Sequence, residues 1–249
     1  GVILGFTGPI ESLTPDMAAA AEMAMKEISD SGIFLGGMKL ESIRADSTCI
    51  DSAAATAAAE RLITSEGIAA IMGADCSGVT GAIASNVAVG NGVVMISPSA
   101  TSPGLTQLED NGLFFRTSPS DARGGEVIAE VLINRGINEI AVTYTNNDYG
   151  KGLSDSFTSA YTKLGGKISI TAAHEDGKGD YSAEVGALAA SGSKHLAVFG
   201  YVDQGGKGII QASLDADAFG VFVLGDGMYG QSLIDAFGSD LDGTIAFVP

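Results

Sequence analysis

Two stretches of small and hydroxyl-bearing residues could bind an anion. They are Gly73–Gly78 (GADCSG) and Ser97–Pro103 (SPSATSP), and each directly follows a short apolar run. In an open parallel α/β sheet, ligands bind just beyond the carboxyl ends of the strands. Backbone N–H groups and hydroxyls at the starts of the following helices suit an anion such as a carboxylate. The two stretches therefore predict an uncharged cradle for a small charged molecule.

Further candidate side chains follow other expected strands. The candidates are Leu13, Ser77, Ala100 and Thr101 in the first half of the chain, and Tyr149, Tyr201 and Asp226 in the second half. Hydroxyls and backbone amides on one wall, with a carboxylate and aromatic rings on the other, suit a zwitterion. On this reading Asp226 takes the ammonium group, while Ser77 and Thr101 take the carboxylate.

Side chains typical of catalysis or metal binding are sparse. The two histidines, His174 and His195, have no metal-ligand spacing. Gly200–Gly208 departs from the phosphate-loop pattern, and the acidic run Glu175–Asp180 is interpreted as a solvated turn rather than a calcium loop. Cys76 lies between a strand and a helix, where a thiol can become nucleophilic, but no general base stands out. We expect no metal, no cofactor and no enzymatic activity.

Composition narrows the class of protein. The net charge of −17 argues against a nucleic-acid or anionic-membrane partner. No apolar run reaches the roughly 18 residues of a membrane span. The chain opens on strand-like residues with no basic segment, so a leader of an exported protein would already have been removed. The two cysteines, Cys49 and Cys76, fit either one disulfide in an oxidising compartment or two buried thiols.

Strand-like and helix-like segments alternate along the chain, which indicates parallel sheets with right-handed crossovers. The expected strands are 2–7, 38–45, 69–72, 93–96, 113–116, 139–144, 167–173, 195–200, 220–224 and 243–248. The expected helices are 15–31, 51–66, 78–89, 122–135, 150–164, 181–190, 204–214 and 231–237. Thr14 and Asp180 are candidates to begin two of these helices.

The pattern restarts near Pro119, which predicts two similar lobes joined by a hinge at about 117–121. We expect an α/β protein of two Rossmann-like lobes, 1–118 and 119–249, with parallel sheets and a ligand cleft between them. A single long sheet is the alternative.

The chain resembles the leucine/isoleucine/valine-binding protein family, the type I periplasmic solute-binding proteins of ABC importers. The matching pieces are spread over the whole chain: Thr7–Ile10, Gly73 with Cys76 and Ser77, Met95–Pro98 with Ala100, Thr101, Leu105 and Thr106, Asp148–Gly150 with Gly152 and Leu153, and Gly225–Gly227.

The resemblance implies a role for each candidate. The family's carboxylate ligands fall on Ser77 and Thr101, and its backbone carbonyl for the ammonium falls on Ala100. Its ammonium-pairing acid falls on Asp226, where the branched-chain binder has a longer Glu. Its aromatic walls fall on Tyr149 and Tyr201, and its aromatic near the first loop on the smaller Leu13. Asp75 and Cys76 border this set, and the family's cysteines matching Cys49 and Cys76 form a disulfide.

Two features depart from the family pattern. Asp75 stands where the branched-chain binder presents an aliphatic residue beside the ligand, and a carboxylate there is costly against an apolar side chain. This favours a polar or cationic amino acid, or a small amide, unless Asp75 simply caps the next helix. Family members also continue past Pro249 and return to the first lobe, so we expect a fragment whose first lobe is incomplete and exposes apolar surface.

The expected function is that of an extracytoplasmic, monomeric solute-binding protein. It would close two lobes on an amino acid or related zwitterion, without making or breaking a bond, and deliver it to an ABC permease. A ligand-sensing receptor module of the same fold is the first alternative. An enzyme of flavodoxin-like or α/β-hydrolase type, with Cys76 as nucleophile, is the second.

Overall fold

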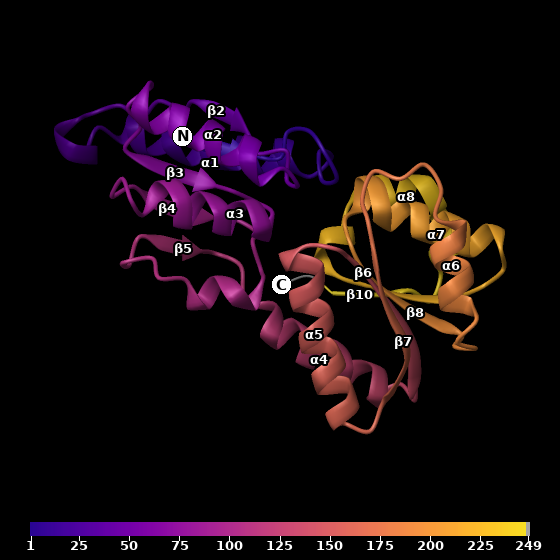
Figure 1. Cartoon of the computed structure of the whole chain (residues 1–249). Coiled ribbons are helices and arrows are strands. Elements are labelled where there is room, and N and C mark those ends of the chain that lie inside the picture. The colour runs from indigo at the N-terminus through magenta and orange to yellow at the C-terminus, as the bar shows by residue number, and fades with distance from the viewer. Residues whose placement is uncertain (248–249) are drawn as a thin grey trace. The chain divides into compact units, whose positions relative to one another are not determined.

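The computed structural model describes residues 1–247 and contains two compact α/β units (Figure 1). The first unit comprises Gly1–Ala100 and Leu108–Ser118, and the second comprises Thr101–Gln107 and the residues from Pro119 onward. Each unit has its own five-stranded sheet, and every strand pair is parallel. This confirms the α/β class with two parallel sheets and excludes the single long sheet.

The first sheet has the strand order β2-β1-β3-β4-β5. Its strands are β1 Val2–Leu4, β2 Arg44–Asp46, β3 Ala70–Gly73, β4 Val94–Ser97 and β5 Phe114–Arg116. The helices are α1 Thr14–Ser31, α2 Ser52–Thr64 and α3 Ser77–Ile83, the last continued by a π turn at Ala84–Ala88. α1 packs through Ala18 on Val2 and Leu4 of β1.

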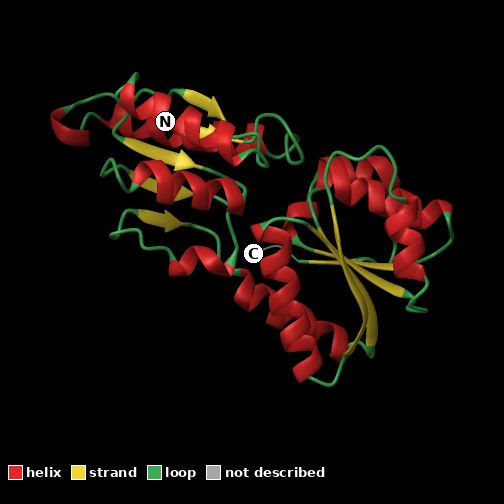
Figure 2. Cartoon of the chain, in the orientation of Figure 1, coloured by secondary structure: helices red, strands yellow, loops and turns green. Residues whose placement is uncertain are grey.

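The second sheet has the order β10-β9-β8-β6-β7. Its strands are β6 Glu139–Thr145, β7 Lys167–His174, β8 His195–Phe199, β9 Val221–Leu224 and β10 Ile245–Ala246. The helices are α4 Asp121–Asn134, α5 Asp148–Lys163, α6 Ser182–Ala189, α7 Lys207–Asp215 and α8 Gln231–Phe237. Within this unit, helices lie on both sides of the sheet, α4 and α5 on one side and α6 and α7 on the other (Figure 2).

Both sheets are doubly wound, and each has one point where the strand order reverses. In the first unit the chain moves from β1 outward to β2 and then returns to β3, so the switch point lies between β1 and β3. In the second unit the same reversal places it between β6 and β8. Adjacent loops leave in opposite directions at such a point, and the crevice that opens there is where doubly wound folds bind ligands.

Several expected boundaries are wrong. β2 is limited to Arg44–Asp46 because only these residues pair with β1, which itself ends at Leu4. α1 includes Thr14, and Leu13 at its N-cap makes no side-chain cap. α6 begins at Ser182 rather than at Tyr181, although the Asp180 carboxylate does accept a hydrogen bond from the Ser182 N–H. The expected strand 243–248 shortens to β10, and Val248 lies outside the described residues.

The expected helix 204–214 begins instead with a π turn at Val202–Gly206. The Gly206 N–H donates to the Tyr201 carbonyl five residues earlier, at 2.9 Å. A Cβ at Gly206 would lie 2.1 Å from the sulfur of Met228, so only glycine fits in this turn. The turn places Tyr201 directly at the end of β8.

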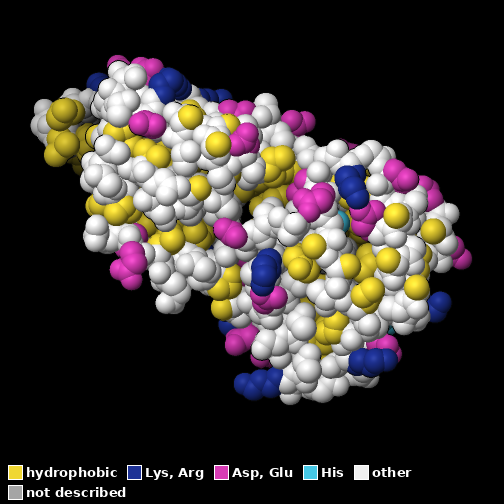
Figure 3. Space-filling model, in the orientation of Figure 1, with side chains coloured by type: hydrophobic (Ala, Val, Ile, Leu, Met, Phe, Trp, Pro, Cys, Tyr) yellow, Lys and Arg dark blue, Asp and Glu magenta, His cyan; other side chains and the backbone are white. Residues whose placement is uncertain are grey.

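The surface reflects the composition. Acidic side chains are scattered over the visible face of both units (Figure 3). In the first sheet, Ile96 and Phe115 are 42% and 52% exposed. No helix within residues 1–247 has both the length and the apolar character needed to cross a bilayer.

Candidate ligand-binding site

The loops that follow β3 and β4 are joined to each other in the first unit. Ser97 Oγ donates to the Ala74 carbonyl at 2.5 Å, and Ser99 Oγ donates to the Asp75 carbonyl at 3.2 Å. Cys76 and Ser77, at the start of α3, are both buried. The two hydroxyl-rich stretches therefore form one connected surface at the carboxyl ends of the strands.

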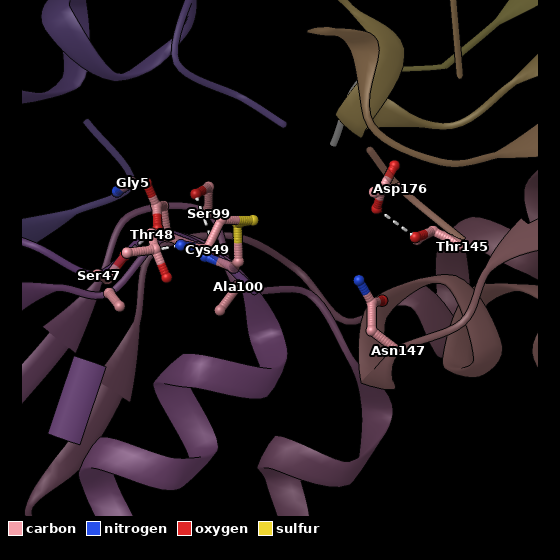
Figure 4. The surroundings of a disulfide bond; sticks show 12 residues. Gly5, Ser47, Thr48, Cys49, Ser99, Ala100, Thr145, Asn147 and Asp176 are labelled. Atoms are coloured by element: carbon pink, nitrogen blue, oxygen red, sulfur yellow. Dashed lines mark hydrogen bonds between the residues drawn. A yellow bond between two sulfur atoms is a disulfide. The ribbon is translucent and has the colours of Figure 1, made fainter. Parts of the chain in front are cut away.

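The predicted disulfide between Cys49 and Cys76 is confirmed. It joins the loop after β2 to the start of α3, and Gly5, Ser47 and Thr48 gather around it (Figure 4). No free cysteine occurs in the part of the chain that the structure describes. Because Cys76 is oxidised, it is not the nucleophile of an enzyme.

Asp75 turns its carboxylate inward, toward neighbouring strand ends. The side chain is 3% exposed and accepts hydrogen bonds from the Gly5 N–H at 2.6 Å, the Cys76 N–H at 2.9 Å and Ser47 Oγ at 3.3 Å. Desolvation raises the pKa of this carboxyl, and the hydrogen bonds partly oppose the shift. The alternative of a helix cap is wrong: Cys76 occupies the N-cap of α3, and no side chain caps this helix.

Ala100 has its backbone groups satisfied within the first unit. Its N–H donates to Ser97 Oγ at 3.0 Å, and its carbonyl accepts from Arg116 Nη1 at 3.0 Å and Ser118 Oγ at 3.2 Å. A carbonyl oxygen has two lone pairs, and both have donors here. A guanidinium at this carbonyl also repels an ammonium group, so the geometry does not favour Ala100 as the ammonium acceptor.

Thr101 presents a hydroxyl that could bind a ligand. The residue is 1% exposed, and Oγ1 has no hydrogen-bond partner among residues 1–247. Its carbonyl accepts from the Asp121 N–H at 2.9 Å, and its contacts place it with the second unit rather than the first. An unsatisfied buried hydroxyl costs about 1–3 kcal/mol, a cost that a bound acceptor would remove.

The aromatic candidates and Asp226 meet in the second unit. The rings of Tyr149 and Tyr201 stack with centroids 5.0 Å apart and an interplanar angle of 15°. The Tyr149 hydroxyl donates to Asp226 Oδ1 at 2.7 Å and accepts from the Gly227 N–H at 3.0 Å. Asn147 caps α5 by accepting from the Gly150 N–H, which fixes the turn that carries Tyr149. The sequence thus identified three residues that the structure brings together.

The electrostatics of this group favour a cation. Desolvation raises the pKa of the Asp226 carboxyl, and burial with the nearby Asp226 charge raises that of the Tyr149 hydroxyl far above its ordinary value. Within the described residues, no lysine or arginine pairs with Asp226. A partly buried carboxylate whose donors are the Tyr149 hydroxyl and uncharged backbone N–H groups gains most from a positively charged ligand group.

Leu13 remains a candidate on position alone. It lies in the loop after β1, is partly exposed, and its N–H donates to the Ile10 carbonyl at 2.9 Å. No group of three or more His, Cys, Asp or Glu among the described residues could hold a metal ion.

Two side chains at the end of β7, Asp176 and His174, were not among the site residues expected from the sequence. Asp176 belongs to the run interpreted as a solvated turn, yet its carboxylate accepts from Thr145 Oγ1 at 2.5 Å and the Gly205 N–H at 3.0 Å. His174 is 2% exposed and its Nδ1 bonds to Thr143 Oγ1 at 2.8 Å. The available signal was their position at the carboxyl end of a strand, where parallel α/β sheets bind ligands.

Buried His174 predicts a pH-dependent stability. Desolvation lowers its pKa to about 4, although Glu184 and Glu175 act in the opposite direction. Between pH 6.5 and 4 the unfolded chain binds a proton at this residue that the folded protein does not. The free energy of unfolding should therefore fall by about 3 kcal/mol as the pH decreases through that range. Urea titrations at a series of pH values measure this effect. Between pH 6.5 and 4 the free energy of unfolding should fall more steeply for wild type than for His174→Asn. Equal pH dependence in the two proteins would contradict the lowered pKa of His174.

Two doubly wound units with polar side chains at their strand ends, and stacked tyrosines in the second unit, are typical of the class of type I periplasmic binding folds. The sequence model of the periplasmic binding protein family matches residues 1–249. The chain belongs to this family of binding proteins.

Known relatives agree with this assignment. Leu/Ile/Val-binding protein homolog 3 of Brucella melitensis is 32% identical over 98% of this chain and 65% of its own length. The crystal structure of leucine-binding protein LivK from Thermotoga maritima has a TM-score of 0.86 and 26% identity, covering 96% of this chain and 66% of that chain. LivJ from Streptococcus pneumoniae, solved with isoleucine, has a TM-score of 0.82 and 25% identity over 96% of this chain and 67% of its own. The chain spans 65% of the Brucella relative's length.

Proposed function

We propose that the protein captures a free α-amino acid outside the cytoplasm and delivers it to an ABC importer. The observation that carries the proposal is the Tyr149–Asp226 pair, a partly buried carboxylate held by a buried hydroxyl. An α-ammonium group placed at Asp226 forms a charge-assisted hydrogen bond and compensates the desolvated charge. The stacked Tyr149 and Tyr201 rings supply a rigid wall beside it.

The carboxylate of the same ligand is assigned to Ser77 and Thr101. The orphan Thr101 hydroxyl supports this assignment, since it is buried and has capacity to donate. Arg116, at the Ala100 carbonyl, adds positive charge on this side of the ligand. A ligand with an ammonium at one end and a carboxylate at the other has a partner for each of its charged groups among these residues.

The ligand class follows from the orientation of Asp75. Sequence reasoning disfavoured an aliphatic ligand because a carboxylate would face it. Both oxygens of Asp75 instead accept hydrogen bonds from its own unit. Since that objection falls away, we assign a neutral aliphatic amino acid, the kind of ligand named for LivK and for LivJ. The disulfide removes Cys76 as a candidate nucleophile, which supports a role in binding.

A thermal-shift screen of the purified protein tests the function. A ligand present at about 1,000 times its Kd adds roughly 4 kcal/mol to the free energy of unfolding. Leucine, isoleucine and valine should raise the melting temperature, whereas their decarboxylated amines and deaminated acids should have much smaller effects because each loses one charged group. Unchanged melting across all twenty amino acids would refute the assignment.

A further inference from the structure

One carboxylate in the first unit spans the switch point of the sheet. Asp75 follows β3, and its side chain accepts from Gly5 at the end of β1 and from Ser47 at the end of β2. In the strand order β2-β1-β3 these are the ends of three neighbouring strands. The backbone carbonyl of the same residue accepts from Ser99, in the loop after β4.

Burying the Asp75 carboxylate in this position costs free energy. Asp75 is 3% exposed and forms no ion pair with a lysine or arginine anywhere in residues 1–247. Burying an unpaired charge is unfavourable, and only donors aimed at the carboxylate offset the cost. A Cβ on Gly5 would lie 3.4 Å from Asp75 Oδ2 and 3.2 Å from the Cys49 Cβ, so this strand end packs tightly against the carboxylate and the disulfide.

In the second unit, the Asp176 carboxylate makes an equivalent set of hydrogen bonds. Asp176 follows β7 and accepts from Thr145 at the end of β6, a bond drawn in Figure 4, and from Gly205 in the turn after β8. The strand order β8-β6-β7 again makes these three neighbours, and the switch point lies between β6 and β8. A Cβ on Gly205 would lie 2.6 Å from Asp176 Oδ1, so the carboxylate and the turn are in close contact.

Each carboxylate holds a loop that carries a proposed ligand residue. Asp75 accepts the Cys76 N–H, one peptide before Ser77. Asp176 accepts the N–H of Gly205, whose π turn, Val202–Gly206, directly follows Tyr201 and is closed by the bond from Gly206 to the Tyr201 carbonyl. The carboxylates themselves are engaged by their own units and are not required to touch the ligand.

We propose that Asp75 and Asp176 are positioning residues that set the width of the switch-point crevice in their own units, Asp75 for Ser77 and Asp176 for Tyr201. The proposal rests on the proposed amino-acid binding for its effect on affinity. Its effect on the loops of the ligand-free protein does not depend on that function.

Double-mutant cycles on leucine binding test the pairing. Asp75→Asn keeps the shape of the side chain but replaces one acceptor oxygen by an NH2 group. It should weaken leucine binding about tenfold, which corresponds to the loss of about one ordinary hydrogen bond. In a Ser77→Ala background the same change should cost less than about threefold, because the residue it positions is already gone. Asp176→Asn should couple in the same way to Tyr201→Ala. The crossed pairs, Asp75→Asn with Tyr201→Ala and Asp176→Asn with Ser77→Ala, should be additive.

A merely structural role predicts a different result, namely additivity in all four cycles together with a general loss of stability. Asp110→Asn is the matched control, since Asp110 accepts from Gly112 N–H in an exposed turn of the first unit. This variant should leave both affinity and melting temperature unchanged.

Amide hydrogen exchange of the ligand-free protein tests the positioning role of Asp75 and Asp176 independently of amino-acid binding. Asp75→Asn should speed exchange at Gly5 and Cys76, and Asp176→Asn at Gly205, each without an effect in the other unit. Unaltered exchange at these amides would overturn the positioning role even if leucine binds. If wild type binds no amino acid while the exchange effects appear, the proposed function is wrong and the structural linkage stands.

Discussion

Replacing Asp226 by asparagine should weaken amino-acid binding about 100-fold. The asparagine keeps the shape of the side chain and an acceptor for the Tyr149 hydroxyl, which lies 2.7 Å from Oδ1. It removes the negative charge that we assign to the ammonium group. Losing one partner of a desolvated charge pair costs about 2–5 kcal/mol, and 100-fold corresponds to about 3 kcal/mol. Isothermal titration with leucine measures the change.

The control for this prediction is a ligand without the ammonium group. The hydroxy acid that matches leucine should bind wild type weakly, and Asp226→Asn should change that affinity little or improve it. Tyr149→Phe should have a smaller effect than Asp226→Asn, because it removes one hydrogen bond and leaves the charge. If Asp226→Asn bound leucine as tightly as wild type, the ammonium group would have to be recognised elsewhere.

The fold was largely predictable from sequence because alternation of short apolar strands with helices specifies parallel sheets. Pro15 near the start of α1 and Gly32 just after its end mark the helix clearly. Gln231–Phe237 was placed without error as α8. β2 was overextended because Met38 lies in a loop and is 59% exposed, and only pairing with β1 decides where the strand begins.

Site residues could be predicted where an aromatic or acidic residue follows the end of an expected strand. Tyr149, Tyr201 and Asp226 were chosen as strand-end residues, and their mutual contacts follow from the sheet order. The direction in which a side chain points was not predictable. Asp75 was expected beside the ligand and Asp176 in solvent, yet both accept hydrogen bonds from strands that are distant in sequence. Such long-range partners have no local signature.

Removing the disulfide is expected to produce the largest loss of stability. Cys49 and Cys76 are 27 positions apart, and the chain-entropy relation gives about 3–4 kcal/mol for a loop of that length. The double variant Cys49→Ser, Cys76→Ser should therefore melt roughly 10 °C lower in the transition of the first unit. Differential scanning calorimetry, with hydrogen exchange to assign the transition, measures the effect.

The backbone conformation around Cys49 determines how much stability the protein loses when the disulfide is removed. Thr48 and Cys49 both have positive φ, 58° and 68°, which L-residues adopt at a cost of about 1–3 kcal/mol each. Without the covalent link, this turn can relax, and the relaxation offsets part of the lost entropy term. Because Ser77 follows Cys76 directly, the relaxed turn should also weaken leucine binding. The single variants should match the double one, since either removes the bond. A melting temperature within 2 °C of wild type would mean that Asp75 and the strand ends hold the loop alone.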